Sequence, residues 1–302
     1  HNHLTTTKGT FPYWVLNKGV DSLYAYVQEH SITTIICVHP LLMMLLTAFE
    51  EKYGQICKTA YVSTDYTCCP GVRDSHPEVC FIPDGSLKED FCCENIKPEQ
   101  IVVSGIPVRQ QFYQKLDKKA AKAQFGIPEG TPHLLVMCGS MGCGPMEELL
   151  EFLDVLDFFV DVHITVVCGS NEPLKCGLSE KYADSENMHI HGYISQISQL
   201  MDSADLFITK PGGLSSTEAA VKGIPMVFVD AVGGCEDRNL DYFCSRGCAV
   251  SGKTPGDIAN QCLALLQDPE RLEKMSDALA HMQIPNSAQI IYETMRAGEA
   301  VI

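Results

Sequence analysis

The sequence predicts an α/β protein made of two Rossmann-like domains, each built on a parallel sheet. Short β-branched or apolar runs alternate with segments of helical periodicity along most of the chain. The runs of the second half are nearly uninterrupted apolar stretches, which is typical of parallel strands covered on both faces. Glycine-rich segments follow several of these runs, where doubly wound sheets bind their ligands.

The first half contains four short runs that predict strands, each ended by turn or cap residues. They are Thr33–Val38, Thr59–Ser63, Val79–Ile82 and Ile101–Val103. Helices are expected over Asp21–His30 and Leu41–Tyr53, where apolar residues recur at helical spacing and Pro40 precedes the second segment.

The second half repeats this alternation more clearly. Its expected strands are His133–Cys138, His163–Cys168, Met188–His191, Leu206–Thr209 and Met226–Val229. Its expected helices are Met146–Phe159, Glu172–Tyr182, Ile197–Ser203, Ser216–Lys222 and Arg238–Ser245. The loops that follow the strands are therefore the places to search for chemistry.

Charge divides the chain into two parts. Residues 1–122 hold 12 Lys and Arg against 13 Asp and Glu, a net of −1, whereas residues 123–302 hold 10 against 25, a net of −15. The step falls just before a turn at Gly126–Gly130, so we expect domains at 1–122 and 123–302. The total of −16 argues against a nucleic-acid partner, which would need a basic surface.

The sequence gives no sign of a membrane span, a leader or a metal site. Its longest apolar stretch, Leu41–Leu46 extended to Phe49, is about half of the roughly 20 residues that cross a bilayer. The 15 cysteines form no CxxC pair and no zinc-finger spacing. We therefore expect reduced thiols, a cytoplasmic protein and no bound metal.

Two glycine-rich loops could hold an anion at a helix N-terminus. In the first, Gly139-Ser140-Met141-Gly142 follows a strand; the alternative interpretation is a tight turn. In the second, Lys210-Pro211-Gly212-Gly213 leads into Ser215, Ser216 and Thr217, whose hydroxyls stand where a diphosphate would rest. Glu218 there is either an acceptor for ribose hydroxyls or the partner of Ser215 in a capping box.

Two further loops are weaker signals. Gly233-Gly234-Cys235-Glu236-Asp237 precedes Asn239, and its polar side chains could hold sugar hydroxyls or complement the helix dipole. Gly192-Tyr193-Ile194 follows another strand and could offer backbone groups to a flat base.

These four loops, in this order, resemble the donor-binding half of family 28 glycosyltransferases. The resemblance is closest to the branch of monogalactosyldiacylglycerol synthase and processive diacylglycerol glucosyltransferase. It rests on Lys210–Ala219, on Gly234–Asn239 followed by Tyr242-Phe243, and on Gly192–Ile194. Upstream, Val38-His39-Pro40, Thr64–Cys68 and Gly105–Arg109 are similar to the acceptor half of that branch, so the resemblance covers almost the whole chain.

The resemblance implies a GT-B fold, with two Rossmann-like domains facing a cleft, and a UDP-sugar bound to the C-terminal domain. Uracil would lie on Gly192, Tyr193 and Ile194, and ribose on Glu218. The diphosphate and hexose would lie on Gly139, Ser140, Met141, Gly142, Lys210, Pro211, Gly212, Gly213, Ser215, Ser216, Gly234, Cys235, Glu236 and Asn239. No cofactor and no metal are implied, because helix N-termini take the role of a cation toward the departing UDP.

The implied activity is inverting transfer of galactose or glucose from a UDP-sugar to diacylglycerol or a related glycolipid. The acceptor domain would face the inner side of a membrane, and the last helix could pack back on it. Two alternatives stay open: a transferase for a polyprenyl-linked cell-wall precursor, and a nucleotide-sugar-binding remnant without turnover.

Two departures from the family pattern matter. Cys235 stands where the family usually has Gln, which leaves the donor sugar open. The family's first strand and its Gly-rich loop with a His would precede residue 1, so we expect an incomplete N-terminal domain and a main catalytic base upstream. His39 and Asp65, each following a strand, are the remaining catalytic candidates; a structural role is the alternative for both.

Overall fold

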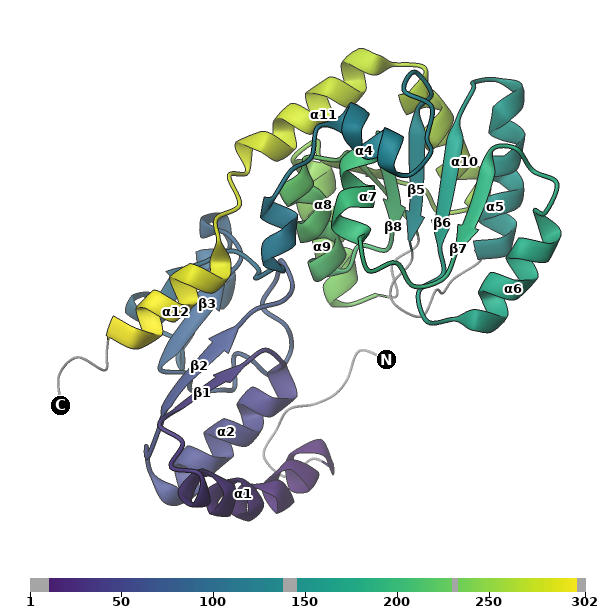
Figure 1. Ribbon diagram of the computed structural model, residues 1–302. Helices are drawn as coiled ribbons and strands as arrows, with labels where there is room; N and C mark the ends of the chain where they lie inside the picture. Colours follow the sequence, from purple (N-terminus) through teal and green to yellow (C-terminus); the bar gives the residue numbers. More distant parts are fainter. Residues whose placement is uncertain (1–10, 138–145, 230–232, 298–302) are drawn as a thin grey trace. The chain divides into compact units, whose positions relative to one another are not determined.

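The computed structural model describes residues 11–137, 146–229 and 233–297, with side chains described from residue 18 onward (Figure 1). The chain forms two compact units: residues 1–107 together with 285–302, and residues 108–284. Each unit contains one sheet, and every strand pairing in both sheets is parallel. The predicted α/β class with parallel sheets is therefore confirmed.

The first unit has a four-stranded sheet in the order β1-β2-β3-β4. Its strands are β1 (Thr34–Cys37), β2 (Lys58–Val62), β3 (Val79–Ile82) and β4 (Ile101–Val103). Its helices are α1 (Phe11–Glu29), α2 (Pro40–Tyr53), α3 (Lys88–Phe91) and α12 (Ser287–Ala297), with 3₁₀ turns η1 (Gly85–Leu87) and η2 (Pro98–Gln100). On one face Val20 and Val27 of α1 pack with Phe49 of α2; elsewhere Ile291 and Met295 of α12 pack against the sheet.

The second unit has a six-stranded sheet in the order β10-β9-β8-β5-β6-β7 (Figure 1). Its strands are β5 (His133–Met137), β6 (His163–Val167), β7 (Met188–His191), β8 (Leu206–Thr209), β9 (Met226–Phe228) and β10 (Ala249–Ser251). The chain runs outward from β5 to β7 and then returns to β8 on the other side of β5. The strand order therefore reverses between β5 and β8, and doubly wound sheets bind ligands beyond the carboxyl ends of strands at such a point.

Helices cover both faces of this sheet. They are α4 (Lys118–Gln124), α5 (Met146–Asp154), α6 (Glu172–Lys181), α7 (Ile197–Ser203), α8 (Gly213–Lys222), α9 (Cys235–Ser245), α10 (Pro255–Leu266) and α11 (Pro269–His281), with 3₁₀ turns η3 (Gln110–Tyr113) and η4 (Val155–Phe158). Most of the apolar strand residues are buried, as the uninterrupted runs predicted; Met137, Ile190 and Val250 are partly exposed.

The predicted helices differ from the observed ones mainly at their ends. The expected helix Met146–Phe159 stops at Asp154 and continues as the 3₁₀ turn η4. Helices α8 and α9 each begin three residues earlier than predicted, at Gly213 and Cys235, because glycines that the pattern assigned to loops form the cap and first turn. Helix α1 begins at Phe11, ten residues before the predicted start, and helices α3, α4, α10 and α11 and strand β10 were not predicted.

The boundary between the two units falls after Pro107, earlier than the predicted position after residue 122. Residues 108–117 belong to the second unit because a buried ion pair and its neighbours bind them there. The Lys222 ammonium lies 2.8 Å from both carboxylate oxygens of Asp202 and donates to the carbonyl of Gln114 at 2.7 Å. Asp202 in turn accepts from the backbone N–H of Leu116, and Ser198 donates to the carbonyl of Gln111.

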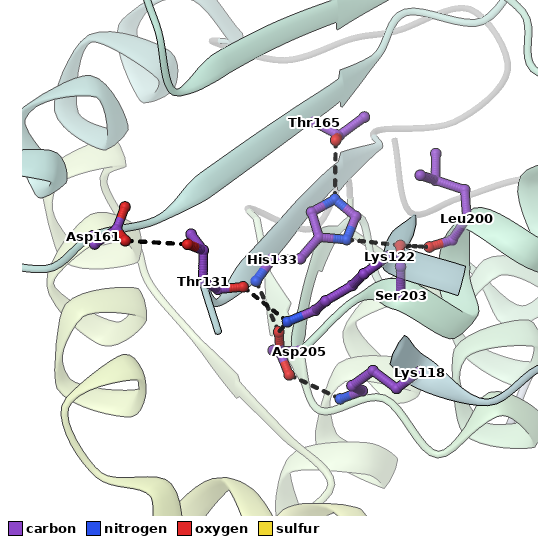
Figure 2. Close-up of polar contacts among 9 residues, drawn as sticks. All are labelled: Lys118, Lys122, Thr131, His133, Asp161, Thr165, Leu200, Ser203 and Asp205. Atoms are coloured by element: carbon purple, nitrogen blue, oxygen red, sulfur yellow. Dashed lines mark hydrogen bonds and ion pairs between the residues drawn. The ribbon is translucent and has the colours of Figure 1, made fainter. Parts of the chain in front are cut away.

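A second polar cluster lies at the amino ends of β5 and β8 (Figure 2). Asp205 accepts hydrogen bonds from the Lys118 and Lys122 ammonium groups and from the backbone N–H of His133, each at 2.8 Å. Burial alone would raise the pKa of Asp205, but these donors hold it below its ordinary value. Lys122 also donates to the carbonyl of Thr131 at 2.8 Å, so the cluster ties α4 to the start of β5.

The imidazole of His133 is fully buried beside this cluster (Figure 2). Ser203 donates its hydroxyl to the carbonyl of Leu200, and it therefore accepts from Nδ1 of His133 at 3.0 Å. Thr165 then donates to Nε2 at 2.9 Å. Both nitrogens are satisfied by the neutral ring, and burial lowers the pKa of His133 to about 3.

Candidate functional site

A cavity of about 480 Å³ opens beyond the carboxyl ends of β5, β6, β7 and β8 in the second unit. The residues that line it are Arg109, Met137, Val167, Gly169, Ser170, Tyr193, Ile194, Ile197, Leu214, Ser215 and Glu218. Its size lies within the range of pockets that hold a nucleotide-sized molecule. The cavity therefore stands where the reversal of strand order predicts a ligand.

The N-terminus of α8 forms one wall of this cavity. Gly212 is the N-cap in an extended conformation, and the first turn contains Gly213, Leu214 and Ser215. The backbone N–H groups of a first helical turn lack acceptors within the helix, and together with the helix dipole they favour a bound anion. Because Leu214 and Ser215 line the cavity, this turn can offer those donors to a phosphate there.

Glu218 lies one turn further along α8. The helix begins at Gly213, so Glu218 is too far from the cap to complete a capping box, and that alternative is excluded. Its side chain is 17% exposed and lines the cavity. Burial raises the pKa of Glu218 to about 7, although the nearby Arg109 opposes the shift.

Arg109 faces Glu218 across the cavity. Its Nη2 lies 4.0 Å from Oε1 of Glu218, and its guanidinium lies over the ring of Phe112 at 5.2 Å. The segment Gly105–Arg109 resembles the acceptor half, but Arg109 belongs to the second unit and lies in the wall of this cavity. The guanidinium of Arg109 is partly exposed and can form an ion pair with a phosphate in the cavity.

The loop after β8 is held from behind by α9. Asn239 is fully buried and donates its amide N–H to the carbonyl of Pro211 at 2.9 Å. This contact positions the backbone between Lys210 and Gly213. Asn239 therefore supports the backbone of this loop, and the hexose contact that the resemblance implies for it stays a prediction.

The glycine pair before α9 is required by the backbone. Gly233 and Gly234 have φ of 92° and 73°, a region that side chains other than glycine rarely adopt. Cys235 and Glu236 follow in the first turn of α9, where the Glu236 carboxylate complements the helix dipole. Cys235 and Glu236, the two candidates for sugar contacts, thus lie in the first turn of α9, the helix that also carries Asn239.

Ser216, whose hydroxyl was expected beside the diphosphate, is not among the residues that line the cavity. Its side chain is fully buried, and its Oγ has no hydrogen-bond partner within the described part of the chain. The helical turn that begins at Gly213 directs Ser215, not Ser216, toward the cavity.

The loop after β7 forms the opposite wall. Tyr193 and Ile194 line the cavity, and Tyr193 is 74% exposed. A Cβ atom at Gly192 would stand 3.3 Å from the Glu172 carboxylate and 3.4 Å from Cδ of Lys175, so a larger residue would press on α6. The predicted loop Gly139–Gly142 lies outside the described residues, although Met137 just before it lines the cavity.

The two catalytic candidates of the first unit have local structural contacts. His39 is the N-cap of α2, and its Nδ1 accepts from the backbone N–H of Leu41 at 3.2 Å. Asp65 follows β2; its Oδ2 accepts from the Cys69 thiol at 3.6 Å and its carbonyl from the Ser63 hydroxyl at 2.9 Å. The structure thus gives His39 a capping role and makes Asp65 part of a tight turn.

The loop of Asp65 is clamped by a carboxylate from α3. Asp90 accepts from the hydroxyl of Thr67 at 3.1 Å and from the backbone N–H of Cys68 at 3.0 Å. Arg73 donates to the other carboxylate oxygen at 3.2 Å. The segment that resembles the acceptor half is therefore fixed by residues that no local pattern had singled out.

Several residues of the cavity were missed because they have no distinctive chemistry. Val167, Gly169 and Ser170 end β6 and begin the next loop, and Ile197 starts α7. Each lies at or just after the end of a predicted strand or at the start of a predicted helix, so its place at the carboxyl edge could have been inferred from the strand order.

The fold and this cavity define an α/β protein with a ligand-sized cavity at the carboxyl edge of a parallel sheet. Two family models match the chain: monogalactosyldiacylglycerol (MGDG) synthase over residues 9–108, and glycosyl transferases group 1 over residues 146–282. A processive diacylglycerol β-glucosyltransferase of Bacillus pumilus is 30% identical over 278 residues, covering 92% of this chain and 71% of that protein. The chain belongs to the family of these processive diacylglycerol β-glucosyltransferases.

Solved structures show the same fold at low identity. MurG of Acinetobacter baumannii superposes with a TM-score of 0.68 at 17% identity, covering 93% of this chain and 78% of MurG. The UDP-GlcNAc 2-epimerase of Neisseria meningitidis, solved with UDP-GlcNAc bound, gives 0.68 at 15% identity over 97% of this chain and 84% of its own. The predicted GT-B fold and the recognised family are thus confirmed.

Proposed function

We propose that this protein is a glycosyltransferase that moves a hexose, glucose or galactose, from a UDP-sugar to diacylglycerol. The single observation that carries the proposal is the cavity at the reversal of strand order, where the first turn of α8 and Glu218 meet. Membership of the diacylglycerol glucosyltransferase family supports this choice. The match of residues 9–108 to MGDG synthase favours diacylglycerol over a polyprenyl-linked acceptor.

In this proposal the cavity holds the nucleotide part of the donor. The uracil lies against Tyr193 and Ile194, and the ribose hydroxyls donate to the Glu218 carboxylate. The diphosphate oxygens accept hydrogen bonds from the backbone N–H groups of Gly213 to Ser215. The guanidinium of Arg109 adds positive charge on the same side. As the sugar leaves, negative charge grows on the diphosphate, and preorganised N–H donors stabilise it without reorganisation.

We propose that the reaction needs neither cofactor nor metal, since the UDP-sugar is itself the substrate. The acceptor hydroxyl attacks the anomeric carbon, its bond to the diphosphate breaks, and the hydroxyl proton passes to a base. Of the two candidates, His39 has its Nδ1 lone pair engaged by the Leu41 N–H, so it carries its proton on Nε2 and can donate a hydrogen bond to the acceptor. Asp65 is the candidate proton acceptor.

We also propose that the first unit contacts the inner face of a membrane, where diacylglycerol lies. Exposed apolar side chains gather where β1 ends and α2 begins: Ile36, Val38, Leu41 and Leu42 are 37–52% exposed. Residues 1–122 carry a net charge of −1, so an anionic membrane surface repels them far less than it repels residues 123–302, which carry −15. Within the described ranges, no helix has the length and apolar character of a membrane span.

The proposal is tested by transfer of labelled hexose from UDP-glucose and UDP-galactose to diacylglycerol in vesicles. Glu218→Ala should abolish transfer and weaken UDP binding while the fold persists. Transfer to a polyprenyl-linked acceptor but not to diacylglycerol would reject the acceptor. For membrane contact, Val38→Ser/Leu42→Ser should reduce sedimentation with anionic vesicles, whereas the equally exposed Tyr292→Ser on α12 should not.

A further inference from the structure

A second cavity, of about 640 Å³, lies in the second unit at the amino ends of β6 and β7. It is formed by the end of α5, the turn η4, the end of α6 and the loop that leads to β7 (Figure 1). The nucleotide cavity lies beyond the carboxyl ends of the same strands, so the two cavities stand at opposite ends of the sheet. The proposed transfer reaction makes no use of the second one.

The wall of this second cavity is strongly acidic. Five carboxylates line it, against one ammonium: Glu151, Asp154, Asp157, Asp184, Glu186 and Lys181. The ammonium of Lys181 already pairs with Glu151 at 2.5 Å and lies 5.6 Å from the ring centre of Tyr182. Four carboxylates therefore remain for a cation from outside.

Two buried polar atoms in the same wall lack partners. Tyr182 is only 8% exposed, and its hydroxyl has no hydrogen bond within the described part of the chain. The amide Nδ2 of Asn187 is also buried without an acceptor, although its Oδ1 accepts from the Ser185 hydroxyl at 2.7 Å. Buried polar groups in native proteins are nearly always paired, so these two atoms indicate a missing ligand.

The rim of the cavity is aromatic. Phe158 lines it and is 86% exposed, and the adjacent Phe159 is 65% exposed. Two neighbouring phenylalanines on a surface rich in carboxylates are unusual for a face that meets only water. A phenyl face attracts a guanidinium or ammonium that stacks over it.

We propose that this cavity binds a basic peptide segment of a partner protein, with an arginine or lysine side chain inserted among the carboxylates. The inserted cation pairs with Asp154 and Asp157 and stacks on Phe158. The Nδ2 group of Asn187 donates to a backbone carbonyl of the peptide, and the Tyr182 hydroxyl takes a donor from the inserted side chain. A polyamine offers cations but no carbonyl, and anionic lipids and nucleic acids are repelled.

The test is fluorescence anisotropy of the full chain with a labelled, terminally blocked hexa-arginine peptide at low salt. Replacing Asp154→Asn together with Asp157→Asn should raise the dissociation constant about tenfold, the effect of about 1.4 kcal/mol. Asp154 precedes η4 and makes no capping hydrogen bond there, so its replacement removes no contact that holds the turn. Phe158→Ser should weaken binding several-fold, because its ring is already exposed and its loss leaves the core intact.

The matched control removes the same charge elsewhere. Glu273→Gln/Asp277→Asn on the exposed side of α11 changes the net charge equally and should alter peptide binding by less than about twofold. UDP binding, measured on each variant, reports that the fold is intact. Equal losses in both double variants would show attraction to overall charge and overturn the proposal, as would no peptide binding. Spermidine binding as tightly as the peptide would overturn the peptide assignment.

Discussion

Replacing Glu218 by Gln should make the protein more stable near pH 8 and yet weaken its binding of the donor. The carboxyl has its pKa raised to about 7 by burial, against 4.5 for an unperturbed glutamate. The unfolded chain therefore releases this proton at lower pH than the folded one. The free energy of unfolding is therefore highest below about pH 4.5, where the carboxyl is protonated in both states. It falls as the pH rises from 4.5 through 7, because the unfolded chain ionises first.

The magnitude follows from the size of the shift. About 2.5 pKa units at 1.36 kcal/mol each give roughly 3 kcal/mol of destabilisation near pH 8, where the carboxylate is ionised in both states. A glutamine has the same shape and no charge, so Glu218→Gln should recover about this amount at that pH and nothing near pH 4. Urea-dependent hydrogen exchange of β8 amides, which report on the second unit, measures the difference.

The same pKa predicts how donor binding depends on pH. In the proposed donor site the ribose hydroxyls donate to an ionised carboxylate, so below pH 7 a proton must first leave Glu218. The dissociation constant for UDP-glucose, whose own charge is constant in this range, should rise about tenfold from pH 8 to pH 6 in the wild type. In Glu218→Gln it should be weaker and independent of pH. A variant that is not stabilised near pH 8, or a wild-type affinity that does not change with pH, would refute this account.

Three further outcomes are expected. UDP should bind equally well with chelator and with magnesium, and binding that disappears in chelator, measured by calorimetry, would contradict the role given to the α8 N-terminus. Lys222→Met should cost about 3 to 5 kcal/mol by stranding the buried Asp202 carboxylate, and adding Asp202→Asn should recover much of it in urea unfolding; no recovery would mean that packing dominates. Burial lowers the pKa of His133 to about 3, whereas the unfolded ring binds a proton below about pH 6.5. The free energy of unfolding should therefore fall by about 2 kcal/mol between pH 8 and pH 5, and this part of the decrease should be absent in His133→Asn.

The sequence predicted the strands of both sheets and most of the donor loops because those signals are local. An uninterrupted run such as Leu206–Thr209 is typical of a buried parallel strand, and the glycines after it allow a close approach to the backbone. Glu218 could be singled out, but its role could not be decided from spacing. That decision depended on whether the helix began at Gly213 or Ser216, a difference of three residues that only the structure resolves.

The missed features depend on contacts between residues far apart in the chain. The hydrogen bond that Asn239 donates to Pro211, 28 residues away in the chain, is one example. The clamp of Asp90 on the loop of Asp65 is of the same kind. Such partners have no sequence pattern, since each side chain alone is an ordinary polar residue on a loop or helix.

The misplaced domain boundary has the same physical origin and shows what charge can and cannot reveal. The lysines near residue 118 form a step in the sequence charge, and the step looked like a linker. In the structure two of them, Lys118 and Lys122, share the carboxylate of Asp205, which stands at the start of β8 (Figure 2). A run of lysines before an acidic domain is therefore bound to that domain by its opposite charge, and the chain changes units earlier, at Pro107, where no charge marks the change.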